Sequence, residues 1–178
     1  MKSSALMEAV REKLDGSAPP AASHEEVAEA EQQLGFALHP LLRSLYTSVA
    51  NGGWGPEYDA PGLIAGARPD SPTDGAVAWY RAMRQPDPDD PSWPGWPTAL
   101  LPVAHWGCAI WSCVDCTTEE GQVVRFDPNV AGTFPHDPWR GVWLPESPSL
   151  AGWLDDWLND RLPFELPPST IERPWSRP

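Results

Sequence analysis

The chain has 178 residues, of which 12 are basic and 25 acidic, so its formal net charge is −13. This length fits one domain with a hydrophobic core. The acidic balance disfavours nucleic acid and anionic membranes as partners, because both require lysine and arginine to neutralise phosphate. It favours a basic protein partner, although a solvated acidic surface would explain the charge equally well.

The sequence shows no obvious signal for export or membrane insertion. No apolar run approaches about 18 residues, so we expect no transmembrane helix. The N-terminal stretch MKSSALMEAVREKLDG lacks the apolar core of a signal peptide. Three cysteines form an odd count that argues against a disulfide framework. We therefore expect a cytoplasmic protein.

Two short helices are predicted near the N-terminus. Apolar residues recur at helical spacing over residues 4–15. Ser23 and Glu26 then show the spacing of a capping box, and Gly35 stands where a left-handed residue ends a helix. A second helix is therefore expected between Ser23 and Gly35.

A third helix is predicted to begin at Pro40, which suits a first helical turn. It runs into the glycine-rich stretch NGGWG at residues 51–55. A phosphate-binding turn requires a strand before its glycines, and a P-loop also requires a lysine after them. Here a helix precedes the glycines and no lysine follows. We interpret them as a helix stop that leads to a short strand at residues 62–64.

The second half of the chain changes from helices to strands. A fourth helix is expected over residues 74–84, and the run PDPDDPSWPGWP at 86–97 is interpreted as an irregular exposed loop. A final amphipathic helix opens at residues 147–149. The strands expected between them cover residues 100–103, 108–116, 122–126 and 142–144.

This order of elements predicts an α+β fold, in which helices pack on a mostly antiparallel sheet. No internal repeat or clear domain linker divides the chain. We expect one domain over residues 1–162 and a proline-rich C-terminal tail over residues 163–178.

Four potential zinc ligands lie close together in the sequence: His105, Cys108, Cys113 and Cys116. Thiolates and imidazoles are the ligands that Zn²⁺ prefers. However, Cys113 and Cys116 would point to opposite faces of an extended strand, and their neighbours are apolar. We interpret the cysteines as buried structural residues that behave as small hydrophobes, and a zinc-binding module remains the alternative. No cofactor is predicted.

Catalytic patterns are weak in this sequence. No G-x-S-x-G nucleophile elbow occurs. His105 and Cys108 could form a dyad in principle, but their spacing does not establish the geometry. Two of the four histidines, His24 and His39, stand at predicted helix starts. Paired carboxylates are abundant in so acidic a chain and therefore uninformative, and no catalytic residue is predicted.

The segment EVAEAEQQLGFALHPLLRSLYTSVANGG at residues 26–53 resembles the N-terminal signature of the SMI1/KNR4, or SUKH, superfamily. Looser similarity to its central strands and closing helix extends the match to roughly residues 24–160. The resemblance implies an α+β fold without catalysis. Many bacterial members are immunity proteins that neutralise toxin domains, often nucleases, whereas fungal members are regulators. The matching positions are Glu31, Leu34, Gly35, Pro40, Leu45, Tyr46, Asn51, Gly52 and Gly53.

The expected function is therefore a non-enzymatic immunity protein that covers a basic toxin domain with an acidic surface. A regulatory scaffold of the SMI1/KNR4 type is the other alternative. Two loops are candidate contacts, because they combine carboxylates with aromatic anchors, although ordinary exposed loops would look the same. The candidate residues are Glu57, Tyr58 and Asp59 after the glycines, and Asp87, Asp89, Asp90, Trp93 and Trp96 in the proline-rich loop.

Overall fold

The computed structural model of the protein describes residues 3–16, 18–57, 60–64, 75–132 and 139–166. The five helices expected from the sequence, and the four strands expected after residue 100, are all confirmed. In chain order the elements are α1 (Ser3–Leu14), α2 (His24–Leu34), α3 (Pro40–Ser48), α4 (Gly75–Met83), β1 (Leu100–Gly107), β2 (Ile110–Asp115), β3 (Val123–Phe126), the 3-10 helix η1 (Pro128–Val130), β4 (Trp143–Ser147) and α5 (Leu150–Leu158).

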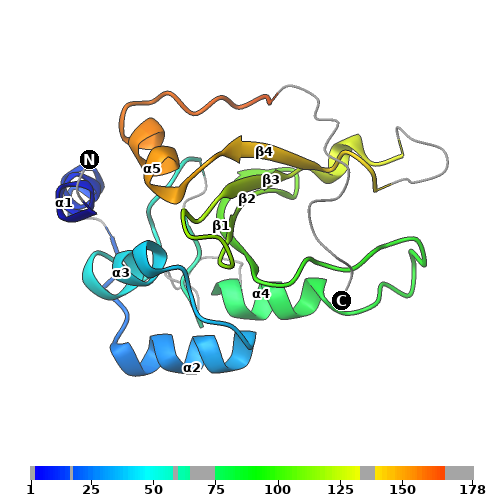
Figure 1. The fold of residues 1–178 in the computed structure, drawn as a ribbon, viewed down its shortest axis with the longest axis horizontal. Coiled ribbons are helices and arrows are strands. Elements are labelled where there is room, and N and C mark those ends of the chain that lie inside the picture. The colour runs from blue at the N-terminus through cyan, green and yellow to red at the C-terminus, as the bar shows by residue number, and fades with distance from the viewer. Residues whose placement is uncertain (1–2, 17, 58–59, 65–74, 133–138, 167–178) are drawn as a thin grey trace.

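The strands form one antiparallel sheet in the order β1-β2-β3-β4. In Figure 1 the helix α4 lies below the strands and α5 lies beside the end of β4. This architecture confirms the α+β fold with helices packed on an antiparallel sheet. Within the described ranges, no helix combines the length and the apolar character that crossing a membrane requires.

Helices cover both faces of the sheet, as two adjacent residues of β2 show. The ring of Trp111 packs against Trp79 of α4, with ring centroids 4.9 Å apart. Ser112 points to the opposite face, where its hydroxyl donates to Glu146. The same carboxylate accepts a hydrogen bond from Trp153 of α5. One face of the sheet therefore packs on α4 and the other on α5.

The predicted capping box at the start of α2 is confirmed. The Ser23 hydroxyl accepts from the Glu26 amide, and the Glu26 carboxylate accepts from the Ser23 amide. The hydrogen bonds that the Glu26 carboxylate receives from Ser23, chiefly from its amide, lower the pKa of Glu26. The reciprocal bonds satisfy two amides that a helix N-terminus otherwise leaves free.

The connection from α2 to α3 is held by residues of the family-like signature. Gly35 adopts φ +80° and its amide bonds to the Glu31 carbonyl, which ends α2. The Glu31 carboxylate then accepts from the Leu38 amide at 2.9 Å and pairs with Arg43 at 3.3 Å. Pro40 stands in the first turn of α3, as expected. Glu31 thus fixes both the loop and the following helix.

The strand expected at residues 62–64 is wrong. Gly62 and Leu63 instead place their carbonyls at the start of α4, where they accept from the amides of Ala76 and Val77. The first amides of a helix have no intrahelical acceptor. These carbonyls satisfy them, so the segment serves as a cap for α4 rather than as a sheet strand.

Candidate partner-binding cleft

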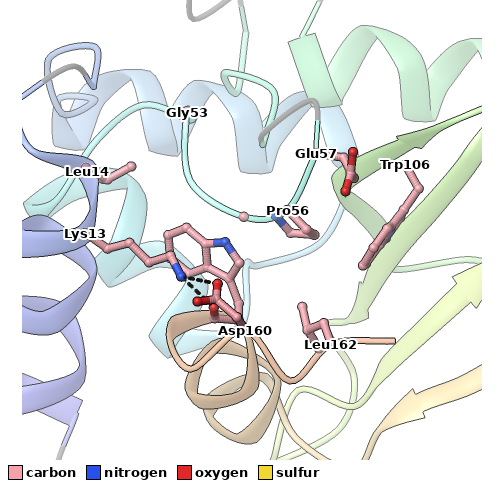
Figure 2. A pocket seen from close by; sticks show the side chains of 10 residues that line it. Lys13, Leu14, Gly53, Pro56, Glu57, Trp106, Asp160 and Leu162 are labelled. Atoms are coloured by element: carbon pink, nitrogen blue, oxygen red, sulfur yellow. Dashed lines mark hydrogen bonds and ion pairs between the residues drawn. The ribbon is translucent and has the colours of Figure 1, made fainter. Parts of the chain in front are cut away.

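A cleft of about 480 Å³ opens where four segments meet: the end of α1, the glycine-rich loop (residues 51–57), the end of β1 and the chain that follows α5. In Figure 2, Lys13 reaches from α1 toward Asp160, while Glu57 and Trp106 lie on the other side. The lining residues are Lys13, Leu14, Gly53, Gly55, Pro56, Glu57, Trp106, Trp157, Asp160 and Leu162.

Two side chains, one in α3 and one just after it, hold the chain where it returns from the glycine-rich loop. The buried Tyr46 hydroxyl donates to the Pro61 carbonyl at 3.0 Å. The Asn51 side-chain oxygen accepts from the Leu63 amide at 2.9 Å. Both bonds join the end of α3 to the chain that follows the loop. The start and the end of the loop are therefore held close together.

The glycines allow the two ends of this loop to approach each other closely. The Gly53 amide donates to the Ala60 carbonyl at 2.8 Å, and the Ala60 amide donates to Trp54 at 2.6 Å. Gly52 has φ +91°, and a Cβ at this position would lie 2.6 Å from the Ala60 oxygen. Only glycine fits there. The glycines therefore shape the loop that carries Glu57 to the cleft.

One wall of the cleft is formed by a lysine that is already paired. The Lys13 ammonium donates to the Trp157 carbonyl and to the Asp160 carboxylate, both at 2.8 Å. It also lies 5.2 Å from the centroid of the Trp157 ring. A cation at the C-terminus of α5 complements the helix dipole. The Asp160 side chain nevertheless remains 89% exposed, so it can contact a second cation.

The cleft combines exposed carboxylates with indole surface. Glu57 is exposed at the tip of the glycine-rich loop, and Trp106 lies beside it on the cleft wall. Carboxylates attract ammonium and guanidinium groups. The indoles of Trp106 and Trp157 are only 5% and 8% exposed, and they already stack against Arg125 and Lys13 of this chain. The exposed carboxylates are therefore the groups suited to receive a basic side chain.

Only part of the first predicted contact can be placed. Glu57 lines the cleft, whereas Tyr58 and Asp59 lie outside the described residues. The second predicted contact, the acidic loop (residues 86–97), contributes none of the residues that line the cleft. The structure therefore does not bring the two predicted contacts together in one site.

The acidic loop is internally bonded. The Asp87 carboxylate accepts from the amides of Asp89 and Asp90. Asp90 accepts from Ser92 and from the Trp139 indole, and these bonds, chiefly that from Ser92, lower the pKa of Asp90. Asp87 and Asp89 remain exposed. The loop therefore presents negative charge from a defined conformation.

The expectation of an exposed anchor is wrong for Trp96, whereas the contact at Trp93 stays a prediction. Trp96 is only 1% exposed, and its indole donates to the Leu100 carbonyl at 2.7 Å. Its ring packs edge-on against Trp79 and Trp143, because the loop folds back over the sheet face that carries α4. Trp93 is half-buried and donates to Met83. Trp96 belongs to the core and is not a surface contact.

The zinc alternative receives no support from the geometry. Among the described residues, no group of three or more His, Cys, Asp or Glu side chains could hold a metal ion. His105 lies against the Trp111 ring, with centroids 4.5 Å apart, and its burial lowers its pKa. Burial also raises the pKa of the Cys116 thiol to about 12 and that of Cys113 well above its usual value. Cys108 departs from the expectation of buried cysteines, because it is exposed in the β1–β2 turn.

Two parts of the site had no clear signal in the sequence. Asp160 follows α5 among several other acidic residues, and the cleft that gives it a role forms only when α1 packs on α5. Trp106 falls between the strands expected at residues 100–103 and 108–116, so the sequence did not place it on a strand. A pattern along one segment does not reveal a cavity that four segments build together.

Comparison with protein-family models identifies a family. The model described as the SMI1 / KNR4 family (SUKH-1) matches residues 21–156. That span includes α2, α3, α4, η1 and all four strands. It also includes α5 up to Asp156, and α1 lies outside it. Comparison with curated proteins gives no significant match.

Proposed function

The chain belongs to the SMI1/KNR4 family (SUKH-1), and from this membership we propose that it is an immunity protein. It binds a toxin domain without catalysis and covers the toxin's functional surface. The partner is a basic protein, such as a toxin nuclease, because proteins that bind phosphate carry clustered lysine and arginine. The proposed site of action is the cytoplasm, where the chain would protect the cell that makes it.

The observation that carries this proposal is the cleft with exposed carboxylates on a chain of net charge −13. The overall charge attracts a basic partner over long range and accelerates its association. At contact, Glu57 and Asp160 pair with a basic side chain of the partner. The exposed Asp87 and Asp89 of the acidic loop provide a second acidic contact on the same chain.

The test begins with capture of the partner from the native lysate at low and at high salt, read by mass spectrometry. A stoichiometric partner with a basic toxin domain, retained at low salt and weakened at high salt, supports the proposal. The captured toxin domain is then expressed with and without this chain. Restored growth on co-expression is the expected result, whereas a toxin that remains fully active would refute the proposal.

A matched pair of variants then locates the contact. Glu57→Gln removes one carboxylate from the cleft, and we expect it to weaken partner binding on the order of threefold to tenfold, mostly through the association rate. Glu29→Gln removes the same charge from an exposed position on α2. If both variants bind equally well, the cleft is not the contact, even if the chain neutralises the toxin.

A further inference from the structure

The C-terminal segment (residues 162–166) lies over the sheet face that carries α5 and is held there by one buried side chain. The carbonyls of Pro163 and Phe164 accept hydrogen bonds from Nη1 of Arg125 on β3. Leu162 lines the cleft described above. The segment is therefore continuous with one wall of that cleft.

The surface beneath the segment is joined by an ion pair, a cation–π contact and hydrogen bonds. The Arg125 guanidinium pairs with Glu146 on β4, and their side chains are 2% and 0% exposed. The guanidinium stacks on Trp106, 4.0 Å from the ring centroid. The Trp106 indole donates to Ser112, whose hydroxyl donates to Glu146. We refer to the surface formed by Arg125 and Trp106 as the Arg125 groove.

The groove has more hydrogen-bonding capacity than the segment uses. Within the described part of the chain, Nε of Arg125 is buried and has no acceptor. Guanidinium N–H groups that lack an acceptor are costly to bury. Because Glu146 neutralises the positive charge, the groove favours neutral acceptors such as main-chain carbonyls. Its chemistry therefore suits an extended peptide better than an anion.

The segment that fills the groove is lightly attached beyond Arg161. Arg161 pairs with Asp155 and Asp156, so the chain is anchored to α5 up to that point. Phe164 in contrast is 59% exposed, and its ring meets Trp106 edge-on with centroids 6.0 Å apart. More than half of the Phe164 side chain is thus already in solvent, whereas the chain up to Arg161 is held to α5 by its ion pairs.

We propose that the Arg125 groove binds an extended segment of a partner protein. The partner segment offers main-chain carbonyls to Arg125 and an aromatic side chain to Trp106, and it replaces Pro163 and Phe164, which fill the groove in the free protein. This site recognises main-chain carbonyls and an aromatic ring rather than a positive charge. It shares Trp106 with the cleft that Glu57 lines, but it does not depend on the partner being a toxin.

The test uses the full chain with the double substitution Pro163→Gly and Phe164→Gly, which loosens the resident segment. The probe is a blocked peptide of sequence LPFELPP, taken from residues 162–168. The signal is the indole N–H resonance of Trp106, assigned from a Trp106→Phe variant. We expect the double substitution to move this resonance and the peptide, at millimolar concentration, to return it saturably toward its original position.

The controls separate specific seating from general binding. A peptide of sequence LPAELPP, which lacks the aromatic ring, should have at least several-fold weaker effect. Arg125→Lys should abolish the response to LPFELPP, with circular dichroism to confirm that this variant is folded. If Arg125→Lys unfolds, the difference between LPFELPP and LPAELPP still tests whether the groove recognises the aromatic ring.

The proposal is overturned if LPFELPP in millimolar excess leaves the Trp106 resonance unmoved, or if both peptides act alike. A doubled molecular mass that appears together with the shift would also overturn it. That result would assign the groove to the C-terminal segment of a second copy of this chain.

Discussion

Gly52→Ala should destabilise the protein far more than the same substitution at Gly35. Both glycines have positive φ, +91° at Gly52 and +80° at Gly35. They differ in the space available to a side chain. A Cβ at Gly52 would lie within 2.6–2.8 Å of backbone atoms of Ala60, Pro61 and Gly62, whereas a Cβ at Gly35 has no neighbour within 4 Å.

The expected magnitudes follow from this difference. A left-handed alanine costs roughly 1–2 kcal/mol at either site. At Gly52 the returning chain must also move, which weakens the bonds from the Gly53 amide to Ala60 and from the Leu63 amide to Asn51. Each contributes about 1 kcal/mol. We expect a total loss of roughly 3–4 kcal/mol for Gly52→Ala, a large share of the stability of an ordinary domain.

Urea unfolding of both variants measures the difference. With a slope of about 2 kcal/mol per molar urea, the midpoint should fall by about 2 M for Gly52→Ala and by less than about 1 M for Gly35→Ala. The slope itself should not change. Equal midpoints for the two variants would refute the inference that Gly52 is required by close backbone approach.

Two further predictions concern buried groups. Glu146→Gln leaves Arg125 buried without a counter-charge and should reduce the free energy of unfolding by about 3–5 kcal/mol, whereas Asp155→Asn, at a half-exposed ion pair, should cost less than about 1 kcal/mol in the same urea titration. Burial raises the pKa of Cys116 from 9.0 to about 12, so the folded thiol keeps a proton that the unfolded chain releases above pH 9. Its contribution to stability is complete below pH 9 and declines up to pH 12, with a slope of at most about 1.4 kcal/mol per pH unit. Cys116→Ala should therefore flatten the alkaline decline in urea midpoint, and Cys108→Ala, at an exposed thiol, should leave it unchanged.

Features that depend on neighbours along the chain could be predicted from the sequence. The capping box of Ser23 and Glu26 joins residues three positions apart, and Gly35 ends the same helix through its own backbone conformation. Apolar spacing identified the helices for the same reason. Such signals do not require knowledge of which distant segment will be adjacent.

Features that depend on contacts between distant segments could not be predicted from the sequence. Trp96 lies in a run of prolines and acids, but its ring fills the space between α4 and the sheet. Gly62 and Leu63 have the composition of a strand, but their carbonyls cap α4. In both cases a tertiary contact decides the outcome, and local propensity is overridden.

The Arg125–Glu146 pair shows the same limit within the sheet. Arg125 stands between Val124 and Phe126 in a short buried strand, where an arginine requires a partner. Its partner is 21 positions away on β4, and its covering carbonyls come from beyond α5. The sequence contains the demand for a partner but not its identity.

The way in which the glycine-rich loop is held has a consequence for how this protein can diversify. Tyr46 and Asn51 hold the returning chain through its main-chain atoms, and Gly53 and Ala60 are joined backbone to backbone. None of these bonds involves the side chain at Glu57, which lies at the exposed tip. The tip can therefore exchange its charge while its position over the cleft is retained, although φ +54° at Glu57 disfavours β-branched residues there. A scaffold built in this way can acquire a new binding specificity by substitution at one position without first acquiring a new fold.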